Sequence, residues 1–474
     1  MKDAHNIPLI RSDFSQEQIS QLFEGQRDFF KMGKSRELAF RIEQLKKLKK
    51  VIQENEEAIL DALALDMSKP RFEAYSSEIG FVYAEINHCL KNLKSWAKPK
   101  KVGSPIFSFP SKSYILPEAK GVCLIIGPWN YPFQLVIGPL IAAISAGNTA
   151  FIKPPEQCPN TSNLVAEILS ANFDQELVCV VQGEGKEVVP QLMNNFRFDH
   201  VFFTGSVPVG KIVGEMAAKK MVPCTLELGG KSPCVIDKSA NFKVAADRIA
   251  FGKWLNAGQT CVAPDYLLVE RQAWDEFREA LESTIKRFYP EGALNSDSYA
   301  SLINKDRFRT IESYLSQGEI IFGGEKDPDN LRIAPTLILH PNLESPIMEE
   351  EIFGPVLPIL LYDFKEDAQA VIAQNPNPLA FYVFSENRKE QEYWQNSVSF
   401  GNGCINNTVI HLANTDLPFG GIGSSGMGNY HGKFGFDTFS HHKAIMKSAN
   451  WLDPKEKYPP YSNFAYRIIH WIMS

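Results

Sequence analysis

The sequence lacks the features that mark several broad classes of protein. Its eight cysteines are scattered, and no two have the short spacing of a zinc site or a redox dithiol, so we expect neither a metal site nor a disulfide framework. The first residues lack the apolar stretch of a signal peptide, and the longest apolar region, residues 121–152, is interrupted by prolines and polar residues. We therefore expect a cytoplasmic protein without a membrane-spanning segment.

The charges are also not gathered into an extended basic surface. The chain has 49 Lys and Arg against 55 Asp and Glu, which gives a net charge of −6. The short basic run at residues 46–50 lies in a helical pattern, and we interpret it as a solvated helix face. Because nucleic-acid binding needs a concentrated basic face, we expect no nucleic-acid partner.

The pattern of apolar residues predicts an α/β protein. With 474 residues the chain is too long for one ordinary core, so we expect two large domains and a smaller element. Apolar residues recur at three- and four-residue steps from Leu38 to Ile52, which predicts a helix. From Gly121 onward short β-branched runs alternate with helical stretches, the pattern of βαβ units on a parallel sheet. The predicted strands are residues 122–126, 149–152, 178–181, 200–203, 266–270, 335–339 and 357–361.

Three further segments have their own character. Residues 101–120 contain prolines, serines and alternating apolar residues and predict a protruding hairpin, whereas the glycine-rich residues 417–435 predict a loop and residues 438–447 a strand. The tail, residues 464–473, predicts a short helix with one apolar stripe. This helix is too short to span a bilayer, which needs about 20 residues, so we expect the stripe to be buried on the protein body or at a membrane surface. The stripe consists of Phe464, Ile468, Trp471 and Ile472.

Two glycine motifs are candidates for phosphate binding. Residues 421–426 fit the GxGxxG pattern, but no strand precedes them and more glycines follow, so we interpret them as a turn-rich loop. At residues 205–210 a strand leads into Gly205 and Ser206, and a helical stretch with Gly210 at its start follows. Main-chain N–H groups at such a helix start can face a pyrophosphate. A plain connection between strand and helix is the alternative.

One cysteine and one glutamate stand in unusual surroundings. Cys261 ends the polar, glycine-containing segment NAGQTC after an apolar helix, where a thiol can face a cleft and be tuned toward thiolate. We interpret the other seven cysteines as small buried apolar residues. Glu227 lies in LELGGK between apolar residues, where desolvation would raise its pKa toward that of a general base. A solvated glutamate at a strand end fits the local sequence equally well.

In combination these segments resemble the aldehyde dehydrogenase superfamily. LELGGKSP around Glu227 and FGKWLNAGQTCVAPDY around Cys261 are similar to its two active-site signatures and occur in the same order. The resemblance extends over about residues 36–447, and Pro155 is one departure from the usual pattern. The lack of a long N-terminal arm and several motifs are similar to the class 3, or fatty-aldehyde, branch. The further matching segments are residues 127–132, 153–156 and 350–356 for the superfamily, and 72–75, 417–421, 430–433 and 458–461 for the branch.

The resemblance implies a fold and an assembly. It implies a Rossmann-like cofactor domain, an α/β catalytic domain and a small β oligomerisation element, usually in a homodimer in which the hairpin and the late strand reach the partner subunit. The corresponding ranges are 1–100 and 119–228 for the cofactor domain, 229–420 for the catalytic domain, 101–118 and 421–450 for the oligomerisation element, and 451–474 for the tail.

The resemblance also implies a reaction, the oxidation of an aldehyde to a carboxylic acid. Cys261 would add to the aldehyde, and the Asn130 amide and the Cys261 main-chain N–H would bind the oxyanion. Loss of hydride leaves a thioester, and Glu227 would activate the water that hydrolyses it. NAD is the implied cofactor, with NADP tolerated. The implied cofactor residues are Lys153 and Glu156 at the adenine ribose, Gly205, Ser206 and Gly210 at the pyrophosphate, and Glu351 and Phe353 at the nicotinamide ribose.

The aldehyde and its pocket are less determined. Aromatic residues near the motifs favour medium to long aliphatic or aromatic aldehydes, although any core would show such residues. These residues are Trp129, Tyr131, Phe133 and Trp254. His431 either lines the pocket or is structural, and the tail helix is either a lid over long acyl chains, a membrane contact or a stabilising element. A CoA-acylating dehydrogenase is the nearest rival, but Glu227 argues for water as the acyl acceptor.

Overall fold

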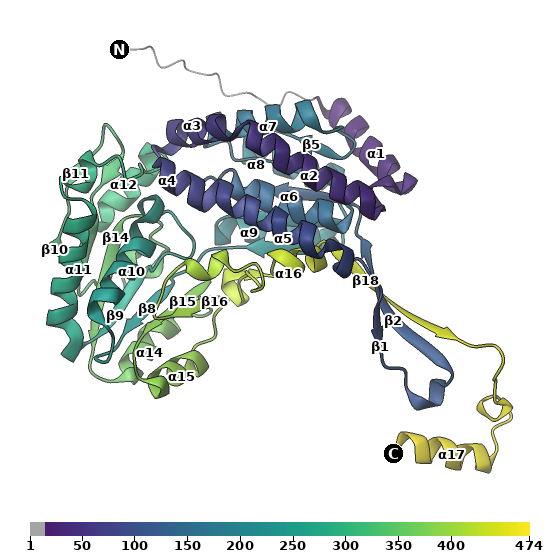
Figure 1. Ribbon diagram of the computed structural model, residues 1–474. Coiled ribbons are helices and arrows are strands. Elements are labelled where there is room, and N and C mark those ends of the chain that lie inside the picture. Colours follow the sequence, from purple (N-terminus) through teal and green to yellow (C-terminus); the bar gives the residue numbers. More distant parts are fainter. Residues whose placement is uncertain (1–14) are drawn as a thin grey trace.

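The computed structural model describes residues 15–474 and contains two β-sheets side by side, each covered by helices, with an arm that projects from them (Figure 1). The predicted α/β fold class is confirmed. The first residues of the predicted cofactor domain, 1–14, lie outside the described part of the chain.

The six-stranded sheet is formed mainly by parallel strands, whose carboxyl ends lie at one edge. β3, β4, β5, β6 and β7 are parallel, and β17 adds to β7 in antiparallel orientation. From β3 the chain adds β4 and β5 on one side, and then β6 and β7 on the other side of β3. The carboxyl ends of β3 and β6 therefore flank a topological switch point, the usual place for a ligand crevice. In sheet order the strands are β17 (Gly426–Met427), β7 (Cys224–Glu227), β6 (His200–Thr204), β3 (Val122–Ile126), β4 (Thr149–Lys153) and β5 (Val178–Val180).

Helices cover this sheet because its strands are apolar on both faces. All five residues of β3 are buried, as expected for a parallel strand with helices on either side. The predicted helix at residues 38–52 is confirmed as α2, whose apolar stripe packs against α5 and α6. The helices of this half are α1 (Gln16–Met32), α2 (Leu38–Glu54), α3 (Glu56–Met67), α4 (Arg71–Ala74), α5 (Gly80–Trp96), α6 (Gln134–Ala146), α7 (Pro159–Asn172), α8 (Gly185–Asn195) and α9 (Val207–Lys219).

The second sheet has seven strands, of which only the edge strand β10 is antiparallel to its neighbour. The predicted strands at 266–270, 335–339 and 357–361 are confirmed to within one residue. In sheet order the strands are β10 (Glu319–Phe322), β13 (Thr336–Leu339), β14 (Val356–Tyr362), β9 (Tyr266–Glu270), β8 (Pro233–Ile236), β15 (Ala380–Phe384) and β16 (Asn402–Ile405). The main helices are α10 (Phe242–Trp254), α11 (Trp274–Phe288), α12 (Lys305–Tyr314), α14 (Lys365–Gln374) and α15 (Arg388–Ser397).

The projecting arm is a small antiparallel sheet of three strands in the order β1-β2-β18 (Figure 1). β1 (Lys100–Val102) and β2 (Ser111–Ala119) form the predicted hairpin. β18 (Ser440–Ser448) is the predicted late strand, and it pairs with β2 along its whole length. The arm therefore joins two segments that are far apart in the sequence.

The prediction of a continuous loop at residues 417–435 is wrong. β17 pairs with β7, and α16 (Gly432–Thr438) packs against α5 and α6. A Cβ on Gly435 would lie 3.1 Å from the Cβ of Ala142 on α6, so this glycine permits close packing of two helices. Because β17 and α16 belong to the body, the arm expected at 421–450 begins at Ser440.

The tail ends in α17 (Asn463–Met473), as predicted, and this helix contacts the hairpin tip at Ile106–Ser108 (Figure 1). The expectation that its apolar stripe is buried on the protein body is wrong for the single chain. Trp471 is 80% exposed and Phe464 65% exposed, and Ala465 is the buried residue of the helix. Within residues 15–474 no helix has the length and apolar character needed to cross a membrane.

Candidate active site

The three predicted catalytic residues come from three different parts of the chain and lie close together in the structure. Asn130 follows β3, Glu227 ends β7, and Cys261 lies in the loop between α10 and β9. The side-chain amide of Asn130 donates from Nδ2 to the main-chain oxygen of Gln259 at 3.1 Å, two residues before Cys261. Glu227 lies near enough to the Cys261 thiol for its charge to act on the thiol pKa. The structure therefore brings all three together.

The loop before Cys261 has an unusual backbone. Asn256, Ala257 and Gly258 have φ angles of 53°, 52° and 78°, so three successive residues are left-handed. Only glycine adopts this conformation without a steric penalty, and for the other two it costs of order 1 kcal/mol each. At Gly258 a side chain is also excluded, because a Cβ would collide with the Gly354 carbonyl. The apolar helix α10 thus ends in a strained turn that leads to the cysteine.

Hydrogen bonds tie this turn to the segment that contains Asn130. The Asn256 side chain donates from Nδ2 to the main-chain oxygen of Asn130 at 3.0 Å. The hydroxyls of Tyr131 and Thr260 lie 2.6 Å apart. Gln259 donates from Nε2 to the Ser301 carbonyl at 3.0 Å, which anchors the loop on its other side. The position of Asn130 relative to Cys261 is therefore set by direct contacts.

The expectation that the surroundings tune Cys261 toward thiolate is wrong. Burial raises the pKa of the Cys261 thiol, and the nearby charges of Glu351 and Glu227 raise it further. The main-chain N–H groups of Cys261 and Val262 act in the opposite direction but do not compensate. The thiol is therefore held protonated until a base removes its proton. Of the other seven cysteines, expected to be buried, Cys224 and Cys404 are partly exposed.

Glu227 is a buried carboxyl group without a hydrogen-bond partner among residues 15–474. Both of its oxygens are inaccessible to solvent, and burial raises its pKa well above the ordinary value. The predicted desolvation is confirmed, whereas the solvated alternative is wrong. In its ionised form, a carboxyl group with a raised pKa is a stronger proton acceptor than an ordinary carboxylate.

A buried ion pair that the sequence analysis missed supports the Asn130 segment. Lys69 and Glu78 are fully buried and lie 2.6 Å apart, and Lys69 also donates to the main-chain oxygen of Asn130 at 3.1 Å. Glu78 accepts from the main-chain N–H groups of Phe133 and Gln134 at 3.1 and 2.9 Å, which caps α6. No local pattern marks this pair, because its two residues meet only through the fold.

Lys153 and Glu156 lie at the carboxyl end of β4, on the edge predicted for the cofactor. They form an ion pair, and Glu156 also accepts from the main-chain N–H of Gly185 at 3.1 Å. Burial acts to raise the pKa of Glu156, but the Lys153 ammonium and the Gly185 N–H lower it on balance. Glu156 is therefore ionised at neutral pH and retains partial exposure at 18% of its side chain.

Gly205, Ser206 and Gly210 form the predicted junction between β6 and α9. Ser206 is exposed and precedes the helix without a side-chain cap, which leaves the first turn of α9 at the carboxyl edge of the sheet. A Cβ on Gly205 would collide with the Phe203 ring, and one on Gly210 with the Leu228 side chain. Packing alone thus accounts for both glycines, but the exposed helix start on the same edge as Lys153 and Glu156 fits a dinucleotide phosphate.

Glu351 and Phe353 belong to a segment that is held by contacts with Trp129 and Arg307. The Phe353 ring meets Trp129 edge-on with centroids 5.1 Å apart, and Phe353 has a φ of 48°. Burial, followed by the charge of Asp265, raises the pKa of Glu351 to about 8. Arg307 donates to the main-chain oxygens of this segment, including that of Ile352. The sequence analysis missed this arginine.

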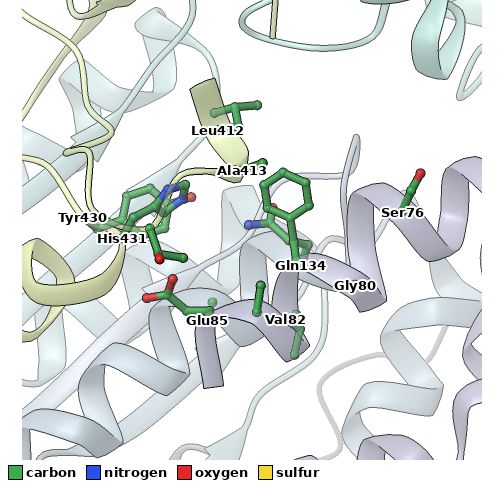
Figure 2. A pocket seen from close by; sticks show the side chains of 13 residues that line it. Ser76, Gly80, Val82, Glu85, Gln134, Leu412, Ala413, Tyr430 and His431 are labelled. Carbon is green, nitrogen blue, oxygen red and sulfur yellow. The ribbon is translucent and has the colours of Figure 1, made fainter. Parts of the chain in front are cut away.

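A cavity of about 200 Å³ is lined by residues of α5, of α6 and of the segment 412–431 (Figure 2). Its wall includes Glu85, Gln134 and Tyr430, and the Tyr430 hydroxyl is near enough to Glu227 and Cys261 for their charges to raise its pKa. His431 lines the same cavity and stacks on Phe419, and burial lowers its pKa to about 4. Its predicted role in a substrate pocket stays a prediction.

The four aromatic residues near the motifs, Trp129, Tyr131, Phe133 and Trp254, are not among the residues that line this cavity. Trp254 is buried and donates from its indole nitrogen to the Pro355 carbonyl at 2.9 Å, so it belongs to the core. Phe133 is likewise a buried core residue. His441 and His442 are exposed, and no group of three or more potential metal ligands occurs in the described part of the chain.

Comparisons with known proteins agree with this architecture. Residues 10–445 match the aldehyde dehydrogenase family. The chain is 47% identical over 445 residues to the 4,4'-diaponeurosporen-aldehyde dehydrogenase of Staphylococcus aureus (strain NCTC 8325 / PS 47), which covers 94% of this chain and 96% of that protein. It is 43% identical over 442 residues to aldehyde dehydrogenase family 3 member A2 of Rattus norvegicus, which covers 92% and 90% of the two chains.

Among solved structures, the substrate-bound state of Staphylococcus aureus AldH matches with a TM-score of 0.93 and 45% identity, covering 96% of this chain and 99% of that chain. Other matching structures were solved with NAD⁺ or with NADP. The chain therefore belongs to the aldehyde dehydrogenase family, in its class 3 branch. The predicted resemblance is confirmed, and the protein is an oxidoreductase of the aldehyde dehydrogenase type.

Proposed function

We propose that this aldehyde dehydrogenase oxidises apolar aldehydes to carboxylic acids through a covalent thioester on Cys261. The observation that carries the proposal is the direct contact between the Asn130 segment and the Cys261 loop, with the unpartnered Glu227 carboxyl beside the thiol. These are a nucleophile, an oxyanion donor and a base within one enclosed site.

The first half of the reaction requires a thiolate. The Cys261 thiol gives its proton to a water molecule, its sulfur forms a bond to the aldehyde carbon, and the carbonyl electron pair moves to oxygen. One N–H of the Asn130 amide and the Cys261 main-chain N–H stabilise that oxyanion. When the C=O bond reforms, hydride leaves and the acyl group remains on sulfur. NAD(P), when bound, supplies the hydride acceptor.

The second half releases the product. The ionised Glu227 takes a proton from a water molecule that adds to the thioester carbon. The C–S bond breaks, the sulfur regains a proton and a carboxylic acid leaves. Because burial raises the pKa of Glu227, its ionised form is a stronger base than an ordinary carboxylate.

The carboxyl edge of the six-stranded sheet fits a dinucleotide. Lys153 and Glu156 would hold the adenine ribose, the start of α9 at Gly205, Ser206 and Gly210 the pyrophosphate, and Glu351 with Phe353 the nicotinamide ribose. The buried Thr204 hydroxyl, which lacks a hydrogen-bond partner within residues 15–474, lies at the same edge. An ionised Glu156 repels a 2′-phosphate and Lys153 attracts it, so we propose NAD as the main cofactor with NADP tolerated.

The surface around the cavity suits an apolar substrate chain. Phe72 and Tyr75, 79% and 44% exposed, come just before the cavity residue Ser76 in the sequence, and Ile410, 54% exposed, comes just before the cavity residue Leu412. Such an exposed apolar rim fits a medium or long acyl chain.

The arm and tail extend this proposal to an assembly. We propose a homodimer in which the arm, β1, β2 and β18, reaches the partner subunit. Because α17 is carried on this arm and exposes its apolar side chains, we propose that it covers the partner's apolar rim as a lid, with contact to a membrane surface as the alternative. All eight cysteines are free, which agrees with a cytoplasmic location.

One assay tests the reaction and separates it from its rival. NAD(P)H formation is followed by absorbance with a medium-chain aldehyde, with and without coenzyme A, and the organic product is identified. We expect turnover without coenzyme A and a free carboxylic acid. Turnover that requires coenzyme A and yields an acyl-CoA would contradict the proposal.

A further inference from the structure

Three carboxyl groups of one helical segment each hold a different loop of the site. The segment runs from α4 through a π-turn, Tyr75–Ile79, into α5. Each carboxylate accepts one or two main-chain N–H groups at 2.6–3.1 Å. The pairs are Glu73 with Asn256, Glu78 with Phe133 and Gln134, and Glu85 with Gly432.

The π-turn allows Glu73 and Glu78 to face the same side. In a regular α-helix, residues five apart lie about 140° apart around the axis. In a π-turn the main-chain hydrogen bond joins residues five apart, whereas in an α-helix it joins residues four apart. The π-turn therefore brings side chains five residues apart closer to the same side of the helix. Glu78 and Glu85 are seven residues apart, which is two turns and keeps them on one face. π-turns occur often at functional sites, and this one aims a carboxylate at the loop of the proposed nucleophile.

Glu73 acts where that loop is most strained. Its Oε2 accepts from the main-chain N–H of Asn256 at 2.9 Å. Asn256 is the first of the left-handed residues before Cys261, and its side chain is held by the Asn130 carbonyl. Glu73 and Asn130 therefore hold Asn256 from two directions, one through the backbone and one through the side chain.

We propose that Glu73 is a positioning residue for aldehyde oxidation: it holds Asn256 in its left-handed conformation and so sets the place of the Cys261 thiol beside Asn130 and Glu227. The inference rests on the proposed function, because it assumes that Cys261 is the nucleophile. Burial raises the pKa of Glu73 to about 7 against the effects of the Asn256 N–H and the Lys69 charge. An enclosed carboxyl group of this kind is unfavourable for stability, which favours a role in the site.

The test uses three variants of the full-length protein. Glu73→Ala removes the acceptor, whereas Glu73→Gln retains a carbonyl oxygen that can accept from Asn256. Asp199→Ala is the matched control, since Asp199 also accepts a main-chain N–H, that of Val122 at 2.9 Å, but at the opposite, amino edge of the six-stranded sheet. For each variant we measure kcat and KM with one aldehyde, the second-order rate of Cys261 alkylation by iodoacetamide, and the melting temperature.

We expect Glu73→Ala to lower both kcat and the Cys261 alkylation rate at least about tenfold, the effect of losing one hydrogen bond to a charged group, with KM little changed. Glu73→Gln should restore both to within about threefold, a small part of that loss. Asp199→Ala should lower the melting temperature without changing the alkylation rate. Unchanged kcat and alkylation in Glu73→Ala, or equal losses in Glu73→Ala and Asp199→Ala, would overturn the inference. Failure of the proposed function has a different signature, which is retained turnover in Cys261→Ala.

Discussion

The side-chain amide of Asn130 and the main-chain oxygen of Gln259 are joined by a hydrogen bond of 3.1 Å, and this bond links the segment after β3 to the loop that leads to Cys261. An amide nitrogen carries two N–H groups, so a second donor remains for a substrate oxygen. Asn130 thus has two functions in our account: it fixes the loop with one N–H and stabilises the oxyanion with the other.

This double function predicts a large effect of Asn130→Ala. Removing one oxyanion donor costs about 3–4 kcal/mol of barrier, so kcat measured in single-turnover experiments should fall about 10²- to 10³-fold. Tyr131→Phe is the matched control, because it removes a different bond between the same two segments, the one to Thr260. Its loss should be much smaller. A loss below about tenfold in Asn130→Ala, well short of an oxyanion donor's effect, would exclude Asn130 from the oxyanion site.

The ion pair of Lys153 and Glu156 predicts how cofactor choice can be changed. Glu156→Gln removes the negative charge and keeps the shape, so the repulsion of a 2′-phosphate is lost while the attraction by Lys153 remains. The ratio of kcat/KM with NADP to that with NAD should rise. Glu344→Gln, at an exposed site away from this edge, should leave the ratio as it is. If both variants show the wild-type ratio, Glu156 does not face the ribose.

Most of the fold could be predicted because its strands carry a strong local signal. β3 and β9 are continuous apolar runs, and their predicted bounds agree with the structure. Prediction failed at residues 417–435, where glycine was interpreted as loop. Gly435 instead permits α16 to approach α6, which depends on a helix that is far away in the sequence.

The site was predictable only as far as its residues lie in recognisable motifs. Cys261, Glu227 and Asn130 could be named from short segments, and the structure brings them together. The supporting residues could not, because Glu73, Lys69 and Glu78 meet their partners only after the helices pack. The pKa of Cys261 was mispredicted for the same reason, since it is determined by burial and by the charges of Glu351 and Glu227, which are far from Cys261 in the sequence but near it in the structure.

Glu85 predicts a dependence of stability on pH. Burial raises its pKa from 4.5 to about 7, against the opposing effect of the Gly432 N–H. Because the folded pKa exceeds the unfolded one, this group's contribution to stability is complete below pH 4.5 and is lost as pH rises to 7, by about 3 kcal/mol.

Glu85→Gln should remove this loss. The free energy of unfolding of the variant, relative to wild type, should therefore increase between pH 4.5 and pH 8, as measured by urea denaturation. Glu344→Gln, an exposed glutamate, serves as the control and should show no such trend. A difference between Glu85→Gln and wild type that is the same at both pH values would contradict the raised pKa.

The proposed lid predicts a dependence on chain length. Deletion of residues 463–474, or Trp471→Ala as a milder change, should lower kcat/KM for long-chain aldehydes and leave short ones nearly unaffected. The reason is that α17 exposes its apolar face on the arm, and in the proposed dimer this face would cover the rim of the partner's cavity, where only a long chain would reach it. A uniform loss for all chain lengths together with a lower melting temperature would show that the helix only stabilises the protein.

The central claim is that the acyl group passes through Cys261 and is released by Glu227, and mass spectrometry of Glu227→Gln tests it most directly. After addition of aldehyde and NAD⁺, this variant should form about one equivalent of NADH and accumulate an acyl adduct on the peptide that contains Cys261. The double variant with Cys261→Ala should form neither. Steady turnover of Glu227→Gln without an adduct on Cys261, or an adduct that persists in the double variant, would contradict the account.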